Sequence, residues 1–201
     1  MLILALDSSG SSCAVGVWRD GAMLSHARED MGRGQDARLM PMVVSAMAEA
    51  KCDFVDLDRV AVTRGPGSFT GVRVGLAAAR GIGIAAEKPV VGVDRFSIYR
   101  ELHADVKNLL VVIQSKRAEL FCRFYSPLGK AQEACMMTEA EIQAFAMVHP
   151  DMQIAGDITS RGADIMPILA RLAANADTKS AEFLPQPLYL RAPDVSFAKV
   201  R

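Results

Sequence analysis

The sequence predicts an α/β protein in which a mixed sheet flanked by helices occurs twice. Short apolar runs bounded by turn residues indicate buried strands, and apolar residues spaced three and four apart indicate helices. In both halves these elements follow the order strand, strand, strand, helix, strand, helix. The repeated order predicts two related lobes, which we place at residues 1–103 and 104–201.

The first half begins with a run, Leu2 to Leu6, that is apolar throughout, as expected of a strand buried on both faces. Asp20 and Gly21 predict the turn of a hairpin between the second and third strands. A helix is expected to start at Asp36, a residue type that favours N-caps. The expected strands are 2–6, 13–18, 22–27, 60–62 and 90–93, and the expected helices are 36–50 and 70–86.

The second half repeats this order. Thr138 and Glu141 have the spacing of a capping box, which predicts that a helix starts there. The proline-punctuated tail from Pro185 to Arg201 is expected to pack across a lobe. The expected strands are 109–113, 120–125, 134–137 and 152–155, and the expected helices are 138–148 and 163–174.

Charge and composition argue against a disordered chain and against a protein that binds nucleic acid by itself. The chain of 201 residues has 23 basic and 23 acidic residues, and 51% of it is apolar, which predicts a globular protein without a polybasic surface. Any nucleic acid is therefore expected to be held through a partner. The four cysteines form no C-x-x-C pair and the three histidines are scattered, so no metal site is expected. The start lacks a basic leader, which favours a cytoplasmic protein without a membrane span.

A glycine-rich segment, Thr63 to Gly75, stands between a predicted strand and a predicted helix. Backbone N–H groups at such a helix start suit an anion. The segment nevertheless lacks the lysine of a phosphate-binding P-loop, and Pro66 stands where a nucleophile elbow requires glycine. Ser68 is therefore a poor candidate nucleophile, and a peptidase is the least favoured reading.

The duplicated plan, with Asp7 ending the first strand and a Ser8–Ser12 turn after it, is similar to the superfamily of actin, sugar kinases and acetate kinase. That resemblance implies two lobes that clamp a nucleotide. It leaves open a stand-alone ATP-dependent small-molecule kinase, with Asp7 orienting magnesium and the Ser8–Ser12 turn holding phosphate. An ordinary tight turn is the alternative interpretation of the same residues.

Four segments in order and spacing resemble the TsaB family of tRNA threonylcarbamoyladenosine synthesis: 4–9, 65–73, 89–93 and 187–191. The resemblance implies duplicated actin-like, or ribonuclease H-like, lobes and no catalytic residue in this chain. It implies a non-catalytic subunit that supports a TsaD-like catalytic subunit, is also bound by a TsaE-like ATPase, and meets tRNA only indirectly. A homodimer is expected when the partner is absent. No cofactor is expected on this chain alone, although ATP or ADP is possible at the partner interface. Gln35 and Gln114 depart from the family's usual His and Asp.

A stripe of small residues within helix 70–86 recurs every four positions, which lets another element approach closely. The stripe fits either the chain's own sheet or a partner, and the family resemblance favours the partner. In the first helix, Met40 and Met47 are assigned to the core and Met42 to an adaptable interface. The predicted interface comprises Met42, Thr70, Gly71, Val72, Gly75, Leu76, Ala79 and Gly83.

Overall fold

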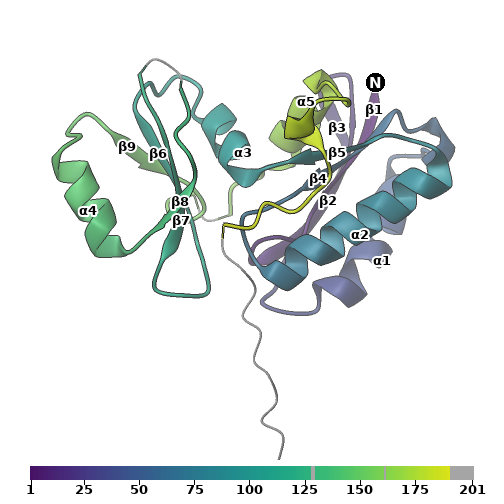
Figure 1. Ribbon diagram of the computed structural model, residues 1–201. Helices are drawn as coiled ribbons and strands as arrows, with labels where there is room; N and C mark the ends of the chain where they lie inside the picture. Colours follow the sequence, from purple (N-terminus) through teal and green to yellow (C-terminus); the bar gives the residue numbers. More distant parts are fainter. Residues whose placement is uncertain (128–129, 161, 191–201) are drawn as a thin grey trace, which may run out of the picture.

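The computed structural model describes residues 1–127, 130–160 and 162–190, and it forms two lobes side by side (Figure 1). The first lobe has a five-stranded sheet in the order β3-β2-β1-β4-β5, and the second a four-stranded sheet in the order β8-β7-β6-β9. The strands are β1 (Leu2–Asp7), β2 (Ser12–Arg19), β3 (Ala22–Asp30), β4 (Arg59–Thr63), β5 (Val90–Val93), β6 (Leu109–Ile113), β7 (Leu120–Tyr125), β8 (Cys135–Met137) and β9 (Gln153–Ala155).

The first sheet is covered by helices on both faces. β1 pairs antiparallel with β2 and parallel with β4, which pairs parallel with β5. Alternate residues of β1 point to opposite faces, so Leu4 packs with α1 (Gln35–Glu49) and α2 (Phe69–Ala86), while Ile3 packs with α5 (Met166–Asn175). This explains why β1 is apolar throughout: neither of its faces meets water.

The second sheet is smaller and is covered by α4 (Glu139–Met147) on one face. β6 pairs antiparallel with β7 and parallel with β9, as β1 does with β2 and β4 in the first lobe. The predicted duplication of a mixed sheet is therefore confirmed. The capping box at the start of α4 is confirmed as well, because Glu141 Oε2 accepts from the Thr138 backbone N–H at 2.7 Å.

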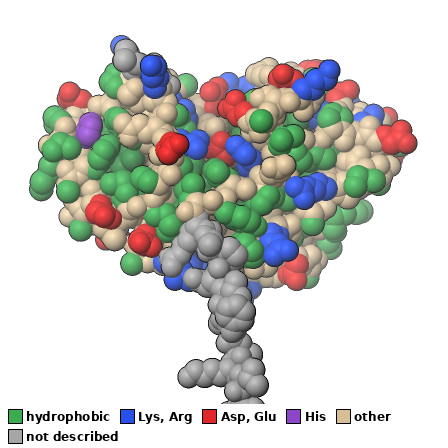
Figure 2. Space-filling view, viewed as in Figure 1, with side chains coloured by type: hydrophobic (Ala, Val, Ile, Leu, Met, Phe, Trp, Pro, Cys, Tyr) green, Lys and Arg blue, Asp and Glu red, His purple; other side chains and the backbone are tan. Residues whose placement is uncertain are grey.

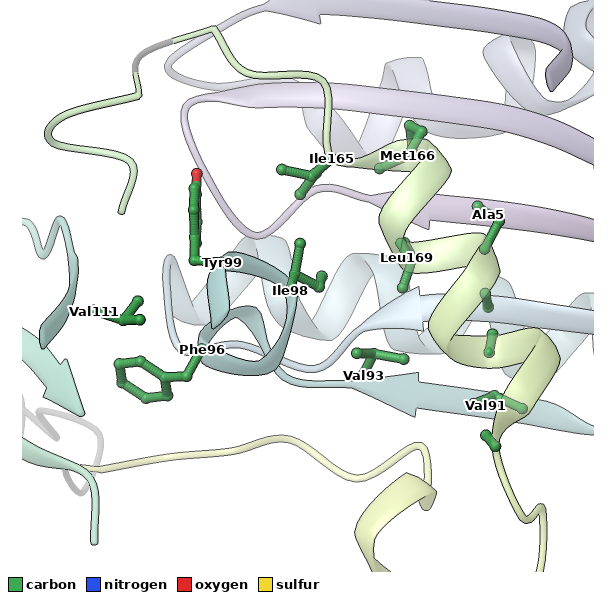
Figure 3. Close-up of a cluster of buried hydrophobic side chains, with 14 of the residues drawn as sticks. Ala5, Val91, Val93, Phe96, Ile98, Tyr99, Val111, Ile165, Met166 and Leu169 are labelled. Atoms are coloured by element: carbon green, nitrogen blue, oxygen red, sulfur yellow. The ribbon is translucent and has the colours of Figure 1, made fainter. Parts of the chain in front are cut away.

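One apolar core joins the two sheets through α3 (Arg95–Leu102), the short helix between them (Figure 3). Phe96 and Tyr99 of α3 pack in the same cluster as Val111 of β6 and Leu169 of α5. Each large apolar side chain buried in this way contributes about 1.5–3 kcal/mol. The two lobes therefore share a core as well as a connection.

Several elements differ from those expected. The predicted order omits α3 and the 3₁₀ turns η1 (Phe54–Asp56) and η2 (Ala181–Phe183). α1 is preceded by Gly34 in a left-handed conformation, with φ of 93°, so Asp36 lies in the first turn and is not the N-cap. α5 starts at Met166, three residues later than predicted, with a proline in its first turn where proline needs no N–H partner.

The last described segments return to the first lobe. α5 packs on β1 and β4, although it lies beyond the predicted lobe boundary, which itself stays a prediction. The following chain runs along α2 and β5: Leu188 N donates to Arg64 O at 2.8 Å, and Arg80 contacts the carbonyl of Pro185. The predicted tail is described only as far as residue 190, and the rest of it lies outside the described residues.

Within the described part of the chain, α2 is one helix that is long and apolar enough to cross a membrane by length and composition alone. In this structure its inner face packs on the first sheet, against β4. Such packing is typical of a core helix.

Candidate functional site

A cleft of about 1160 Å³ lies between the lobes. Its walls come from the end of β1 and the turn after it, from the glycine-rich segment, and from the loops that follow β6 and β9. In this fold the carboxyl ends of parallel strands meet at one edge, which is where ligands of open α/β sheets bind. The cleft is therefore the candidate ligand-binding site of this chain.

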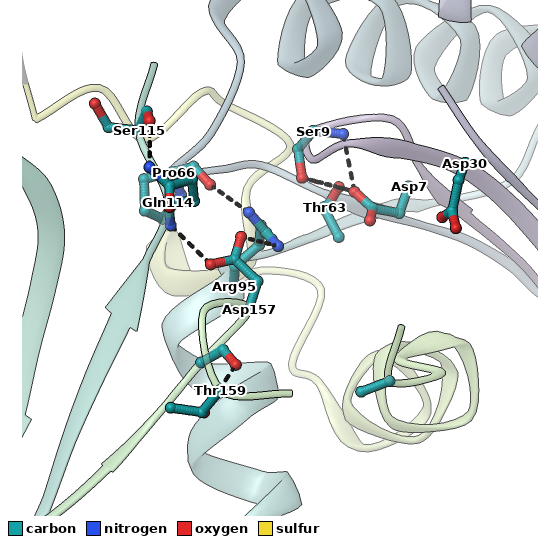
Figure 4. A network of polar contacts seen from close by, with 12 residues as sticks. Asp7, Ser9, Asp30, Thr63, Pro66, Arg95, Gln114, Ser115, Asp157 and Thr159 are labelled. Atoms are coloured by element: carbon teal, nitrogen blue, oxygen red, sulfur yellow. Dashed lines mark hydrogen bonds and ion pairs between the residues drawn. The ribbon is translucent and has the colours of Figure 1, made fainter. Parts of the chain in front are cut away.

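Asp7 stands at the floor of the cleft and is only 3% exposed (Figure 4). Its Oδ1 accepts three hydrogen bonds, from the Ser9 backbone N–H at 3.0 Å, from Ser9 Oγ at 2.6 Å and from Thr63 Oγ1 at 2.5 Å. These bonds tie the turn after β1 to the end of β4. One oxygen of the predicted magnesium-orienting residue is thus already used to hold the structure together.

The glycine-rich segment brings the turn after β1 into direct contact with the start of α2. A Cβ at Gly67 would lie 2.2 Å from Ser9 O, and one at Gly71 would lie 2.0 Å from Ser8 O. Only glycine allows this approach, because real Cβ atoms are not found so close to backbone. In return, Ser68 N donates to Ser9 O at 2.7 Å and Ser8 Oγ donates to Gly71 O at 2.8 Å.

This contact changes the interpretation of the helix start. The Ser68 N–H that the sequence offered to an anion is used by the chain's own turn. Ser68 itself is the N-cap of α2, since its Oγ accepts from Gly71 N at 3.4 Å. The glycine motif therefore serves the fold: it closes the hairpin onto the helix.

A partly buried ion pair crosses the cleft between the lobes (Figure 4). Arg95 Nη2 donates to Asp157 Oδ2 at 2.9 Å, while Asp157 Oδ1 accepts from the Gln114 backbone N–H at 2.7 Å. Arg95 Nη1 also donates to Pro66 O at 3.4 Å. Burial by itself lowers the pKa of Arg95, but the nearby Asp157 and Asp7 outweigh it and raise the pKa. Arg95 thus stays charged and links the glycine-rich segment to the second lobe.

Sequence reasoning missed this pair because it missed α3, which carries Arg95. The signal that was present is Asp94 three residues before Ser97: Asp94 Oδ1 accepts from Ser97 N at 3.0 Å and caps the helix. Asp157 follows β9 and lies 62 positions away from Arg95 in the sequence. No local pattern connects residues at that separation.

Most residues of the predicted partner interface are covered by their own chain, and their role in binding a partner stays a prediction. Seven of its eight residues are buried within the chain itself. A Cβ at Gly75 would lie 2.8 Å from Ser8 Oγ, and one at Gly83 would lie 2.3 Å from Val90. The small-residue stripe therefore packs on the chain's own sheet, which was the other reading of the sequence. Thr70 is exposed, and its role stays a prediction. The residues covered by their own chain are Met42, Gly71, Val72, Gly75, Leu76, Ala79 and Gly83.

Two of the three methionines of α1, Met40 and Met42, lie on other faces than the sequence predicted. Met42 is 2% exposed and lies in the core, whereas Met40 is 41% exposed. The buried face follows the spacing of Leu39, Met42, Val43 and Met47, so Met40 falls outside it. Met47 is in the core as expected.

The outer face of α1 and α2 is the surface that these two helices leave uncovered. It carries apolar side chains at Met40, Val44 and Ile84, of which Val44 is 58% and Ile84 80% exposed. Ala77 and Gly81 of α2, which have helical spacing to Ile84, are also exposed and small. We call these five residues the outer helical face.

Two positions that depart from the family pattern have local roles. Gln35 Nε2 donates to Met31 O at 3.3 Å, and Gln114 Nε2 donates to Ser115 O at 2.7 Å. Gln114 directly follows β6, and Asp7 is the last residue of β1, the corresponding strand of the first lobe. Among residues 1–127, 130–160 and 162–190, no group of three or more His, Cys, Asp or Glu side chains gathers as a cation site, and the four cysteines are free.

The sheet orders and the cleft at the carboxyl ends of β1 and β6 define a two-lobed protein of the actin-like, ribonuclease H-like class. The chain belongs to the family described as "TsaD: tRNA N6-adenosine threonylcarbamoyltransferase", whose profile matches residues 29–198.

Named relatives agree with the predicted resemblance. Over 93 residues the chain is 40% identical to "tRNA threonylcarbamoyladenosine biosynthesis protein TsaB" of Escherichia coli K12, covering 46% of this chain and 40% of that protein. Over 125 residues it is 32% identical to the protein of the same name from Haemophilus influenzae, covering 60% and 52%. The matched stretch thus spans about half the length of these relatives.

Among solved structures, "YeaZ from Pseudomonas aeruginosa" superposes with a TM-score of 0.70 at 21% identity, covering 94% of this chain and 99% of that one. At this identity the likeness shows the fold alone. It extends over both lobes.

Proposed function

We propose that this chain is a non-catalytic subunit of tRNA threonylcarbamoyladenosine synthesis that binds and supports a TsaD-like catalytic subunit. The observation that carries the proposal is the family match over most of the chain, together with relatives named as TsaB. Because the match spans about half of those relatives, the function and partners of the whole protein belong to this proposal.

The cleft supports a scaffolding role. Asp7 Oδ1 is used by Ser9 and Thr63, and the start of α2 is occupied by the turn after β1. Arg95 and Asp157 neutralise one another across the floor. Groups that would otherwise hold a phosphate or a cation are here engaged in holding the two lobes in place.

The docking surface that we assign to the TsaD-like subunit is the outer helical face. Family membership suggests the TsaD-like subunit as the molecule that binds this face. The exposed side chains of Val44 and Ile84 provide apolar area of the kind that is buried in the core of an interface. Ala77 and Gly81 lack bulk, so a partner helix can approach α2 closely. The helices of the first lobe thus keep their proposed role in partner binding. On α2, however, the proposed docking surface is the exposed face and not the buried face that carries the small-residue stripe.

Co-purification tests this assignment. Ile84→Asp places a charge on the outer helical face at its most exposed apolar side chain, and we expect about tenfold or weaker binding to the TsaD-like subunit of the same organism. The matched control is Met147→Asp on α4, where Met147 is 83% exposed in the other lobe. Circular dichroism confirms that both variants are folded. Wild-type affinity in folded Ile84→Asp, or an equal loss in Met147→Asp, would overturn the surface.

Further parts of the proposal follow from the family. A TsaE-like ATPase joins the complex, tRNA is met through the partner, and the chain forms a homodimer without it. This chain binds no cofactor alone, ATP or ADP lies at the partner interface, and the complex works in the cytoplasm. Size-exclusion chromatography with light scattering, with and without each partner, measures these assemblies.

The rival function is an ATP-dependent small-molecule kinase, which the size of the cleft and the position of Asp7 favour. Calorimetry of the isolated chain with magnesium and ATP separates the two functions. The proposal predicts no saturable binding at micromolar ATP, whereas tight binding that Asp7→Asn abolishes would establish the kinase.

A further inference from the structure

Two arginines from opposite lobes meet at one carboxylate where the lobes join. Arg64 follows β4, and Arg123 lies on β7. Both face Asp94: Arg64 Nη2 is 3.8 Å from its Oδ2, and Arg123 Nη1 is 3.5 Å from its Oδ1. The side chains of Arg64 and Arg123 remain 17% and 20% exposed. The cluster is sheltered and can still be reached from solvent.

Asp94 does not satisfy the hydrogen bonding of the two arginines. Its Oδ1 accepts from Ser97 N at 3.0 Å and its Oδ2 accepts from Ser97 Oγ at 2.9 Å, which caps α3. The distances to Arg64 and Arg123 exceed the usual 2.7–3.2 Å of an N–H···O hydrogen bond. Asp94 therefore offsets part of the charge, while the guanidinium donors keep unused capacity.

The unused capacity includes buried atoms. The Nε atoms of Arg64 and Arg123 are shielded from solvent and have no hydrogen-bond partner in the described part of the chain. A guanidinium presents five N–H donors in a planar fork, and a buried donor left unpaired is costly. Two such forks on either side of a junction match a group that is rich in oxygen and negatively charged.

The neighbouring groups add positive charge and a further donor. The Arg100 guanidinium lies 5.8 Å from the centre of the Tyr125 ring, and the same side chain donates to two backbone carbonyls. Burial raises the pKa of Tyr125, Asp94 raises it further, and Arg123 and Arg100 act in the opposite direction. The phenol is therefore protonated at neutral pH. Arg64 and Arg123 face the single carboxylate of Asp94, which leaves a surplus of positive charge at this junction.

We propose that Arg64 and Arg123 form an oxyanion site that takes a phosphate group and thereby links the two lobes. A phosphate group presents several acceptor oxygens and carries the negative charge that this cluster lacks. Free phosphate and the backbone phosphate of an RNA offer the same oxygens, so both are candidate sources. Figure 2 shows Lys and Arg side chains, interspersed with Asp and Glu, at the surface where the two lobes meet. The site lies outside the cleft floor of Asp7 and does not depend on the proposed function.

Calorimetry with inorganic phosphate tests the site on the full chain, at constant ionic strength with chloride as the balancing salt. We expect saturable binding to the wild type and about tenfold or weaker binding to Arg64→Gln and to Arg123→Gln. Arg33→Gln is the matched control: it removes the same charge from an exposed loop and is expected to keep wild-type affinity. No saturable binding by the wild type, or wild-type affinity in the two Gln variants, would overturn the site.

Two further measurements keep the test decisive. Arg123→Lys keeps the charge and loses the fork, so weaker phosphate binding in this variant supports the site even if the Gln variants do not fold. A short single-stranded RNA is then added to the phosphate complex. Displacement of phosphate by the RNA identifies a backbone phosphate as the source, and undisturbed phosphate binding identifies the free ion. Equal affinity for phosphate in Arg123→Lys and the wild type contradicts the proposed fork.

Discussion

The inner and outer faces of α2 contain similar small residues, but only those of the inner face are packed against the rest of the chain. On the inner face, Gly71 and Gly75 lie against the turn after β1, where a single added carbon would meet Ser8. On the outer face, Gly81 has nothing within 4 Å of where its Cβ would be. The inner face stabilises the fold of the chain, and the outer face leaves space for another molecule to approach the helix. A small residue on a helix thus marks a close approach only when its side of the helix is known.

The strongest way to break this comparison is to add one carbon to the inner face. Gly71→Ala places a Cβ 2.0 Å from Ser8 O, which belongs to the backbone and cannot rotate away. We expect a loss of about 3 kcal/mol in the free energy of unfolding, at the upper end for overpacked sites. Urea denaturation measures it. A change below about 1 kcal/mol would show that the turn and the helix are not tightly docked.

High pH probes the interior behind the same inner face through Cys13, which is buried with α1 and α2. Burial, with Asp7 and Glu29, raises the pKa of this thiol from 9.0 to about 11. The folded state therefore favours the neutral thiol, and the stabilisation is complete below pH 9 and lost as the pH rises towards 11. The expected loss is about 3 kcal/mol.

Denaturation at several pH values between 8 and 11 measures this loss, with Cys13→Ala as the control. Cys122, whose pKa burial raises to about 12, contributes in the same direction in both proteins. The difference between wild type and Cys13→Ala isolates Cys13. Parallel pH profiles in the two proteins would contradict the raised pKa.

The outer face gives the smallest effect, and with the opposite sign. Gly81→Ala adds a methyl group in open space and removes the backbone entropy cost of glycine within a helix. We expect a gain of about 0.5–1 kcal/mol. Thermal unfolding alongside Gly71→Ala sharpens the comparison, since destabilisation in Gly81→Ala would mean that the outer face is packed as tightly as the inner one.

Local patterns in the sequence predicted most strands and the helices with clear periodicity. β1 was readable because its apolar run ends at Asp7, and α4 because Thr138 and Glu141 cap it. α3 was not, because its eight residues are too few to show a periodicity. Local patterns carry no information about contacts between residues that are far apart in the sequence.

The candidate site was predictable only in part for the same reason. Asp7 and the glycine-rich segment were each recognised in the sequence, but their contact was not. Thr63, the first residue of that segment, and Asp7 are 56 positions apart, and no local pattern links residues at such a separation. The pairing of Arg95 with Asp157 and the meeting of Arg64 with Arg123 also depend on the assembled lobes. Residue spacing located the stripe on α2 but could not tell which surface it would cover.

We propose that this chain supports catalysis by a partner and performs none alone. Formation of threonylcarbamoyladenosine on unmodified tRNA tests it, with the chain alone, the TsaD-like subunit alone, and both together, each supplied with threonylcarbamoyl donor and the TsaE-like ATPase. We expect product only when both subunits are present, and loss of that product with folded Ile84→Asp. Product formed by this chain without the TsaD-like subunit would contradict it.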